Sequence, residues 1–263
     1  MPGCNMTDDR EEPIVGEIIT EQRGKVLVVT IANERKRNAL SVSMEKPFLE
    51  ALVEADNNDT VRAIVITGAG NIAFCSGHDL SEVGRPGIKF TKPDPMGHPD
   101  RMNKPVIAAV NGHCHAAGLM MALCCDLRIA SENAAFGQPG AKLGQLPAGG
   151  QIWRIGQAIP RAKALEMMMT ADVLSAPEAY RLGMVNVLTP QGGALEAAVE
   201  LANRIARNSP ATVQAIKAGL KIFDREGKEA FDRYEATAIK DLASGPDMAE
   251  GMRAFTEKRA PDF

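Results

Sequence analysis

Residues 106–130 read VIAAVNGHCHAAGLMMALCCDLRIA and indicate the fold class. The apolar run 106–110 predicts a buried strand, which Asn111-Gly112 ends. The Ala, Gly, Met and Leu residues that follow predict a helix, and 127–130 predict a second buried strand. A strand, a helix and a strand in about 25 residues are typical of the βαβ unit of a parallel sheet. The segment therefore predicts an α/β protein.

The N-terminal part of the chain predicts further strands around one helix. Two β-rich runs, 14–19 and 25–31, are separated by the polar segment 21–24, which predicts a hairpin. Apolar side chains then recur at helical spacing over residues 41 to about 57, with a serine as N-cap candidate at the start. Residues 61–67 predict a continuous buried strand.

The segment between the two buried strands has a different composition. Residues 84–103 hold four prolines and three glycines and show little hydrophobic period. This composition predicts a mobile surface loop, of the sort that often covers a site.

From about residue 160 onward the sequence predicts helices. We expect a flexible tail over residues 1–13, an α/β core over 14–204 and a helical region over 205–263. The last helices have amphipathic faces that could pack on the core or on another subunit. The predicted helices span 161–170, 176–182, 195–206, 211–223, 228–242 and 248–258.

Charge and composition argue against several kinds of partner. The formal net charge of -3 and the pI of about 5.9 provide no large positive field for nucleic acid or an anionic membrane. No apolar run approaches the roughly 20 residues of a membrane span, and residues 1–13 are polar and acidic, unlike a secretory signal. The five cysteines are scattered and do not indicate a disulfide framework. We therefore expect a cytoplasmic protein.

Two junctions in the sequence are candidates for chemistry. Residues 73–80 (AFCSGHDL) and 111–118 (NGHCHAAG) place small residues where a strand passes into a turn or a helix. The first N–H groups of a helix lack partners and carry positive partial charge. Two such places that face each other form an oxyanion hole, although small residues at a helix start more often serve close packing. The GAG at 68–70 lacks a third glycine at dinucleotide spacing and predicts a tight turn.

Several short motifs follow one another in a specific order. They are RKRNAL (35–40), GAG (68–70), FCSGHDL (74–80), KPVIAAVNG (104–112), CDLRIA (125–130), FGQP (136–139), residues 179–187 and EKR (257–259). In this order the chain resembles the crotonase superfamily of enoyl-CoA hydratase/isomerase proteins, from about Val15 to Lys258. The resemblance implies an α/β fold with a crotonase-like (ClpP/crotonase) spiral ββα core and a C-terminal helical trimerisation region. It also implies a homotrimer or dimer of trimers, a coenzyme A thioester as substrate and no permanently bound cofactor.

Residue by residue, the resemblance implies a site for the thioester. The backbone N–H groups of His78 and Ala117 would hold the thioester oxygen, on which an enolate carries negative charge. Lys258 would reach the CoA of a neighbouring subunit, or is a plain surface lysine. The basic turn at 35–37 is available to phosphates, or is simply solvated. The residues implied to contact the CoA thioester are Arg35, Arg37, Ala39, Ser76, His78, Asp79, Leu80, Met120, Gly140 and Lys258.

The sequence departs from the family at the acid/base positions. Hydratases of the family hold a water between two glutamates, and the matching positions here are Met120 and Gly140. A third acidic position, used by some relatives, reads Ala148. None of these side chains transfers a proton, so the sequence predicts neither standard hydration nor the usual double-bond shift. A carboxylate from another segment, such as Glu82 or Asp94, would restore hydratase chemistry.

Histidines and one cysteine are the remaining candidates for chemistry. His98 lies in the predicted loop and could act as the base when the loop closes, or is an exposed loop residue. His115 could line the pocket or cap the helix. Cys114 points away from His113 and His115 in an extended chain, so we expect no metal site.

Three functions stay open on the sequence. The first is an enzyme that stabilises a thioester enolate in an oxyanion hole, with its reaction unassigned. The second is a non-catalytic acyl-CoA-binding or assembly protein. The third is an acyl-CoA thioester hydrolase with Cys114 as nucleophile, which needs a base and a lowered pKa.

Overall fold

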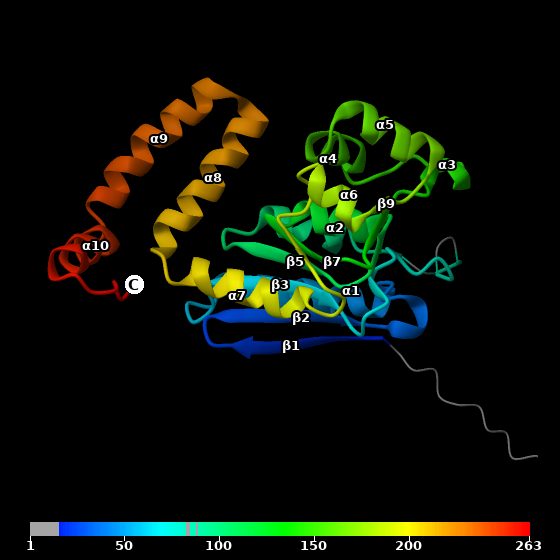
Figure 1. The fold of residues 1–263 in the computed structure, drawn as a ribbon, viewed down its shortest axis with the longest axis horizontal. Helices are drawn as coiled ribbons and strands as arrows, with labels where there is room; N and C mark the ends of the chain where they lie inside the picture. Colours follow the sequence, from blue (N-terminus) through cyan, green and yellow to red (C-terminus); the bar gives the residue numbers. More distant parts are fainter. Residues whose placement is uncertain (1–15, 83–84, 88) are drawn as a thin grey trace, which may run out of the picture.

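Two β-sheets form the centre of the molecule (Figure 1), a computed structural model that describes residues 16–82, 85–87 and 89–263. The predicted tail over residues 1–13 lies outside them. The larger sheet has the strand order β1-β2-β3-β5-β7-β10 and the smaller one β4-β6-β8-β9. The strands are β1 (Glu17–Arg23), β2 (Val26–Ala32), β3 (Ala63–Gly68), β4 (Ala73–Cys75), β5 (Val106–Val110), β6 (His113–His115), β7 (Leu127–Ser131), β8 (Ala135–Gly137), β9 (Leu174–Ser175) and β10 (Val187–Thr189).

Helices cover both faces of the larger sheet. They are α1 (Val42–Asn57), α2 (Ala117–Cys124), α3 (Gly140–Leu143), α4 (Gln151–Ala158), α5 (Arg161–Thr170), α6 (Ala176–Arg181), α7 (Ala194–Ala206), α8 (Pro210–Glu226), α9 (Lys228–Ala243) and α10 (Pro246–Glu257), with 3-10 helices η1 (Glu34–Lys36) and η2 (Pro95–Arg101). The predicted helices from residue 161 to the C-terminus are confirmed within three residues at each end. The α/β class is confirmed as well.

The predicted hairpin forms, but its turn is shorter than the sequence suggested. Strand β1 continues through residues 21–23, and only Gly24 and Lys25 turn. Gly24 has a φ of 64°, which glycine adopts without strain. Polar side chains at the end of β1 are compatible with a strand because β1 lies at the edge of the sheet.

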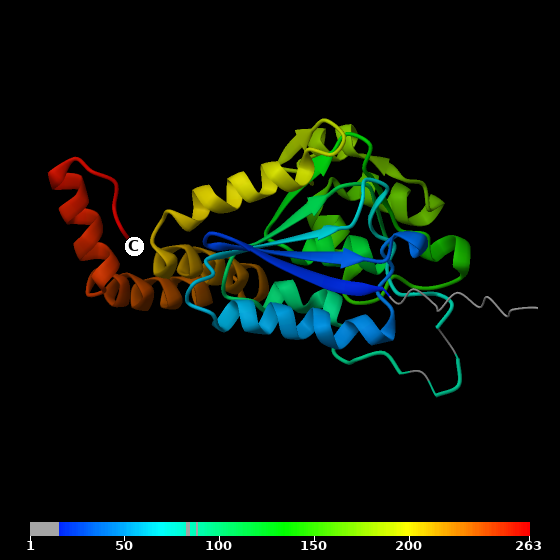
Figure 2. The same cartoon turned by 90° about the horizontal axis from the view of Figure 1, so that it is seen from below.

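The parallel strands separate two layers of the core. Strands β2, β3, β5, β7 and β10 run parallel, and β3 and β5 are fully buried. Successive side chains of a strand face opposite sides. Ile64 and Ile66 therefore join the cluster that contains α1 and α2, whereas Ala63 and Val65 pack with α7. Figure 2 shows α1 and α7 on opposite faces of this sheet.

The predicted mobile loop over residues 84–103 is only in part a surface loop. Its second half forms η2, which packs against α1 and α2. The side chains of Met96 and Met102 are fully buried there. Asp94 caps this helix by accepting a hydrogen bond from the N–H of Met96 at 2.9 Å, and prolines favour its φ angles. The high proline and glycine content of residues 84–103 predicted a loop, so Met96 and Met102 were not predicted as core residues.

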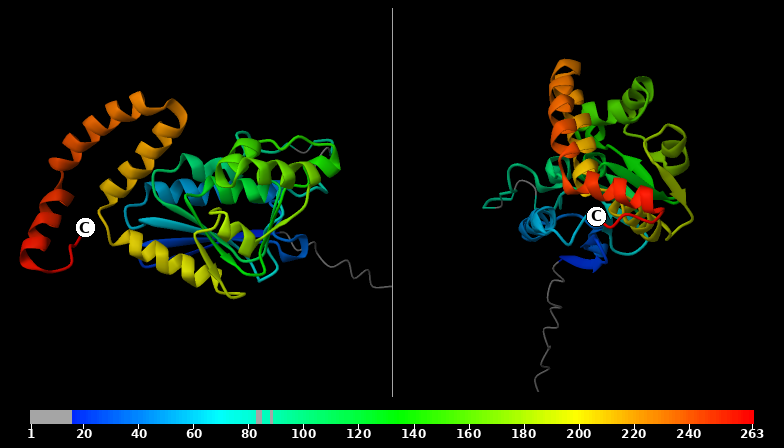
Figure 3. Two further views of the ribbon diagram at one scale, coloured as in Figure 1. Left: turned by 45° about the horizontal axis from the view of Figure 1, so that its top comes forward. Right: turned by 90° about the vertical axis from the view of Figure 1, so that its left-hand side faces the viewer.

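Helices α8 to α10 form an arm beside the sheet core (Figure 3). The predicted core boundary at 204/205 falls in the last turn of α7, which packs on the sheet, and the arm begins at α8. Lys217 and Arg225 of α8 form ion pairs with Asp126 and Asp100 of the core. Among the described helices, none is long and apolar enough to cross a bilayer.

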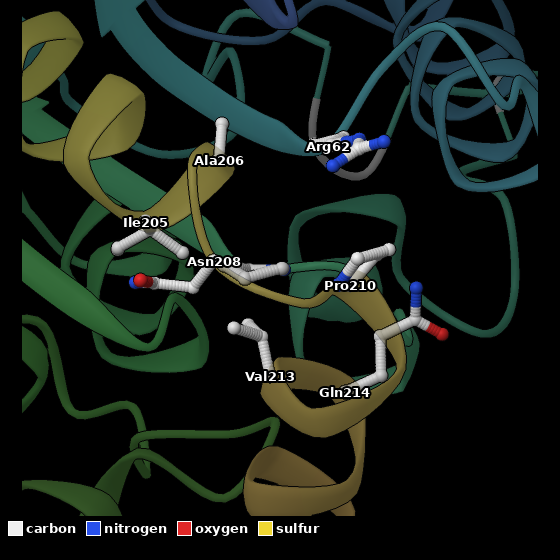
Figure 4. A pocket seen from close by; sticks show the side chains of 8 residues that line it. Arg62, Ile205, Ala206, Asn208, Pro210, Val213 and Gln214 are labelled. Carbon is white, nitrogen blue, oxygen red and sulfur yellow. The ribbon is translucent and has the colours of Figure 1, made fainter. Parts of the chain in front are cut away.

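A small pocket marks the joint between α7 and α8 (Figure 4). Its volume of about 10 Å³ accommodates roughly one water molecule. It is therefore too small for an organic substrate. Its lining is Arg62, Pro105, Ile205, Ala206, Asn208, Pro210, Val213 and Gln214.

Candidate active site

The end of β4 and the start of α2 lie in close contact. A Cβ atom on Gly118 would lie 2.1 Å from the carbonyl oxygen of Cys75. A Cβ on Gly77, whose φ is 99°, would lie 3.1 Å from the backbone nitrogen of Ala117. Only glycine allows the two backbones to approach this closely. The structure thus brings together the two junctions that the sequence marked.

The N–H of His78 is directed away from its neighbouring strand. Leu40 and His78 form a parallel bridge, in which the N–H of Leu40 donates to Gly77 O at 2.9 Å and the N–H of Asp79 donates to Leu40 O at 3.2 Å. These bonds use the residues on either side of His78, so its own N–H points to the other side. It has no acceptor among the residues that the structure describes.

The N–H of Ala117 is likewise unpaired within the described part of the chain. Ala117 is the first residue of α2, and a first-turn N–H has no partner inside its helix. The preceding Ala116 has φ 51° and ψ -123°, a conformation that costs a non-glycine residue about 1–3 kcal/mol. A hydrogen bond from its N–H to Gly137 O, at 3.0 Å, anchors it to β8. At the first turn of α2 the helix dipole adds positive potential to the N–H of Ala117.

The basic turn at 35–40 lies against residues 76–80. The N–H of Ser76 donates to Arg37 O and its hydroxyl donates to Lys36 O, both at 3.1 Å. Lys36, which the sequence analysis did not single out, forms an ion pair with Asp79. Burial disfavours the charged form of Asp79, but hydrogen bonds from Lys36 and Ser81 outweigh it and lower its pKa.

The predicted CoA contacts differ in exposure. Ala39 and Asp79 are buried, whereas Arg35, Arg37 and Leu80 are exposed at the surface of this region. Lys258 is exposed at the C-terminal end of α10, on the arm. Because Asp79 is held by Lys36 and Ser81, we expect it to stabilise the turn rather than to act as a base.

The imidazole of His78 lies between two carboxylates. Its Nε2 atom is 2.9 Å from Oδ2 of Asp94, and its Nδ1 atom is 3.7 Å from Oε1 of Glu45. Phe90 contacts the ring edge-on, with 4.7 Å between the ring centroids. Glu45 was not predicted as a site residue, although it stands three residues before Phe48 on the apolar face of α1. A carboxylate on the apolar face of a predicted helix is the sequence feature that could have identified Glu45.

Comparison with known proteins settles the family. A sequence profile described as enoyl-CoA hydratase/isomerase matches residues 21–263. The chain belongs to this family. It is 36% identical to enoyl-CoA hydratase EchA19 of Mycobacterium tuberculosis, over 94% of this chain and 96% of that protein. It is also 36% identical to the short-chain-enoyl-CoA hydratase of Clostridium acetobutylicum, over 93% of this chain and 96% of that one.

Solved structures of the enoyl-CoA hydratase/isomerase family share this fold. The crystal structure of enoyl-CoA hydratase EchA1 from Mycobacterium marinum matches with a TM-score of 0.88 and 34% identity, and covers 93% of this chain and 97% of that chain. An enoyl-CoA hydratase from Mycobacterium tuberculosis H37Rv matches with a TM-score of 0.89 and 33% identity, with the same coverage. The crotonase-like fold that the resemblance implied is confirmed.

The positions matched to the family's two glutamates lie in crowded surroundings. Met120 is buried, and its Sδ would be 2.1 Å from a Cβ on Gly149. A Cβ on Gly140 would be 2.5 Å from the carbonyl oxygen of Gln145 and 2.9 Å from Oε1 of Gln138. Ala148 is exposed. A longer side chain at position 140 would therefore displace the backbone of its own turn.

Glu82, one of the two carboxylates that the sequence suggested as replacements, stabilises a helix instead. Oε2 of Glu82 accepts a hydrogen bond at 2.8 Å from the N–H of Val42, the first residue of α1. A side-chain acceptor at a helix N-terminus stabilises the helix. Glu82 is therefore a cap, and Asp94 is the suggested carboxylate that lies against His78.

His98 lies on η2 and has neighbours of its own. Burial and the charge of Arg101 lower its pKa, while Asp56 acts in the opposite direction. Asp56 lies near the end of α1, where it accepts hydrogen bonds from the N–H groups of Asn103 and Lys104. Within the described residues, His98 has no hydrogen bond to a residue of the His78 region. A catalytic role for His98 stays a prediction.

Strand β6 alternates as the sequence predicted. Cys114 is fully buried, while His113 and His115 lie on the opposite face with ring centroids 5.3 Å apart. Burial raises the pKa of the Cys114 thiol well above its usual value, which opposes formation of a thiolate. Burial, His113 and Arg37 lower the pKa of His115. The described residues contain no cluster of three or more His, Cys, Asp or Glu that could hold a metal ion.

Proposed function

We propose that this chain binds a coenzyme A thioester and stabilises its enolate with the backbone N–H groups of His78 and Ala117. The observation that carries the proposal is the close contact of Gly77, which precedes His78, with Ala117 at the start of α2; the backbone N–H groups of His78 and Ala117 each lack an acceptor in the described structure. Enolate formation moves negative charge onto the thioester oxygen. Donors that already point at this position stabilise the charge without reorganisation. The names of the relatives, enoyl-CoA hydratases, agree with such a substrate.

The proposed CoA site follows the turns beside this pair. The guanidinium groups of Arg35 and Arg37 are exposed and would pair with phosphates, and the backbone of residues 78–80 would hold the pantetheine. Met120 and Gly140 would lie beside the acyl group. Lys258 would serve the CoA of a neighbouring subunit. We propose a cytoplasmic enzyme with acyl-CoA as its partner, without a permanent cofactor, a nucleic acid or a membrane.

Standard hydration does not fit these surroundings. Addition of water needs an acid and a base on the substrate and the water. Neither the thioether of Met120 nor Gly140 supplies one. The reaction we propose is removal and return of a proton beside the thioester carbonyl, which needs one base from another segment instead of an acid and a base that act on substrate and water. The same observation favours a silent acyl-CoA-binding protein as the second candidate, whereas the buried Cys114 argues against the thioester hydrolase.

Two assays on the wild-type protein test this proposal. Crotonyl-CoA hydration is followed by loss of the enoyl chromophore, and exchange of the α-protons of butyryl-CoA in deuterated water is followed by NMR. We expect binding at micromolar concentration by calorimetry, exchange above background and no hydration above background. Coenzyme A without an acyl group is the control for binding through the nucleotide alone.

Each other result has a clear meaning. Binding with neither reaction would support the silent protein. Hydration at rates typical of enzymes, about 1–10³ s⁻¹, would show that another acid/base pair replaces positions 120 and 140. Absence of binding would contradict the proposal as a whole.

We also propose that the arm mediates a homotrimer or a dimer of trimers. It exposes large apolar side chains, including Leu220 at 62% and Phe255 at 81% of their accessible area. Several large exposed apolar side chains on one helical unit are typical of a surface that another chain covers. Light scattering should give three or six subunits for the wild type and fewer for Leu220→Asp. Thr237→Asp, at an exposed polar site on the arm, should leave the mass unchanged; a monomeric wild type would contradict the proposal.

A further inference from the structure

We propose that the carboxylate of Asp94 is the base that removes the α-proton, and that the imidazole of His78 positions it. The inference rests on the proposed enolate chemistry and adds the group that takes the proton. It replaces the missing glutamates with a carboxylate from a different segment.

The ring of His78 connects three separate elements. His78 follows β4, Asp94 caps η2, and Glu45 comes from the first turn of α1. The ring donates from Nε2 to Asp94 at 2.9 Å and turns Nδ1 toward Glu45 at 3.7 Å. The arrangement fixes both the tilt of the ring and the carboxylate that the ring holds.

On the buried side of the His78 ring, two atoms lack partners among the residues that the structure describes. Glu45 is 1% exposed, and neither its Oε1 nor the Nδ1 of His78 has a hydrogen-bond partner there. The other oxygen of Glu45 accepts from the N–H of Thr91 at 2.6 Å. A buried polar atom without a partner costs about 1–3 kcal/mol. A proton between Nδ1 and Oε1, after a small closing movement, would satisfy both atoms.

The outer side of the chain is open to a substrate. The side chain of Asp94 is 33% exposed. Oδ1 accepts from the N–H of Met96 and Oδ2 accepts from His78, both at 2.9 Å. Each carboxylate oxygen has a second lone pair, so both can accept again. Asp94 therefore has a fixed orientation and free accepting capacity, which a base requires.

The position of Asp94 relates it to both proposed oxyanion donors. The residue whose ring holds Asp94 also supplies the first backbone N–H. The neighbouring Met96 is buried in the same apolar cluster as Ala117 and Met120, and η2 packs on α2. Asp94 thus lies at the edge of the region in which the thioester carbonyl and its α-carbon would sit.

The proposed step balances without a further reactant. The α-proton moves to a carboxylate oxygen of Asp94, and the C–H electron pair forms the enolate double bond. The negative charge moves to the thioester oxygen, where the N–H groups of His78 and Ala117 stabilise it. When the protonated Asp94 trades its proton with solvent, return of a deuteron from deuterated water to the same carbon gives exchange. Return of a proton to the γ-carbon of a β,γ-unsaturated substrate gives a double-bond shift.

The substitution Asp94→Asn tests the base directly. A general base contributes about 10²–10⁴-fold, so we expect α-proton exchange of butyryl-CoA to fall about a hundredfold. The calorimetric Kd should stay within about threefold, because the N–H pair and the CoA contacts are unchanged. Asp100→Asn is the matched control. Asp100 lies on the same η2 and pairs with Arg154 and Arg225 instead of the site.

The outcomes separate this inference from the proposed function. Exchange in the wild type and an equal rate in Asp94→Asn would overturn the role of Asp94 alone. Equal losses in Asp94→Asn and Asp100→Asn would show that only the conformation of η2 matters, and would also overturn it. A wild type that binds but does not exchange would overturn the enolate proposal itself, together with its base.

The positioning role of His78 has its own readout. His78→Ala keeps the backbone N–H and removes the ring, so kcat for exchange should fall at least tenfold with little change in KM. Added 4-methylimidazole should restore part of the rate by occupying the space between Glu45 and Asp94. A rise in KM with unchanged kcat, or a loss without rescue in a folded protein, would contradict the positioning role.

Discussion

Gly118→Ala should reduce α-proton exchange by about a thousandfold. The added Cβ would lie 2.1 Å from the carbonyl oxygen of Cys75 and 2.7 Å from its carbonyl carbon, both backbone atoms that cannot rotate away. The start of α2 would have to move about 1 Å away from β4, which separates the N–H of Ala117 from that of His78. Loss of one oxyanion donor costs about 10²–10³-fold, and overpacking costs a further 1–3 kcal/mol of stability. Exchange by NMR and the unfolding midpoint measure the two effects.

A glycine elsewhere provides the control for this substitution. Gly156 lies inside α4, and a Cβ there would meet no atom within 4 Å. Gly156→Ala should leave exchange unchanged and stabilise the helix by up to about 1 kcal/mol. Full exchange activity in Gly118→Ala would show that the close contact of β4 and α2 does not form the site.

Asn111→Leu should lower the free energy of unfolding by about 3–5 kcal/mol. The side chain is 5% exposed, and its Nδ2 donates to the carbonyl oxygens of Gly68 at 2.9 Å, Gly70 at 2.6 Å and Ala73 at 3.1 Å. Its Oδ1 accepts from the N–H of Gly68 at 3.3 Å. Asn38 still donates to Ala73 O, but the groups of Gly68 and Gly70 lose this partner. Each buried group left unpaired costs about 1–3 kcal/mol.

Denaturant unfolding at one fixed protein concentration measures this loss, since subunit association would otherwise shift the result. The control is Asn57→Leu, because Asn57 is exposed and donates to Val53 O at 2.8 Å. That variant should change stability by at most about 0.5 kcal/mol. Equal effects of the two substitutions would mean that the Asn111 side chain does not hold the turn before β4.

Local signals predicted most of the fold. The helices from residue 161 onward were predictable because their amphipathic faces and their starts lie within each segment. The buried strands β3 and β5 were predictable from continuous apolar runs. The smaller sheet was not, since β4, β6 and β8 have three residues each and show no period. Helix η2 was hidden because proline and glycine also mark loops.

In the candidate site, too, local features were predictable and contacts between distant segments were not. The two strand-to-helix junctions were visible as short runs of small residues, and the order of motifs related them to a thioester. The partners of the His78 ring were not predictable together, because Glu45, His78 and Asp94 come from three elements that meet only in the tertiary structure. Asp94 appeared in the sequence only as a possible replacement carboxylate. Lys36 was hidden within a basic turn that looked solvated.

The crowding around Gly140 also restricts how this chain can change. Since a Cβ there would lie 2.5 Å from the backbone oxygen of Gln145, a glutamate at this position requires a new path for the turn between residues 138 and 147. No exchange of one codon supplies both changes. Replacement of residue 140 alone therefore does not place a carboxylate at this position, because the backbone of the turn has to be rebuilt with it. An engineer who wished to introduce one would begin with the length of the turn.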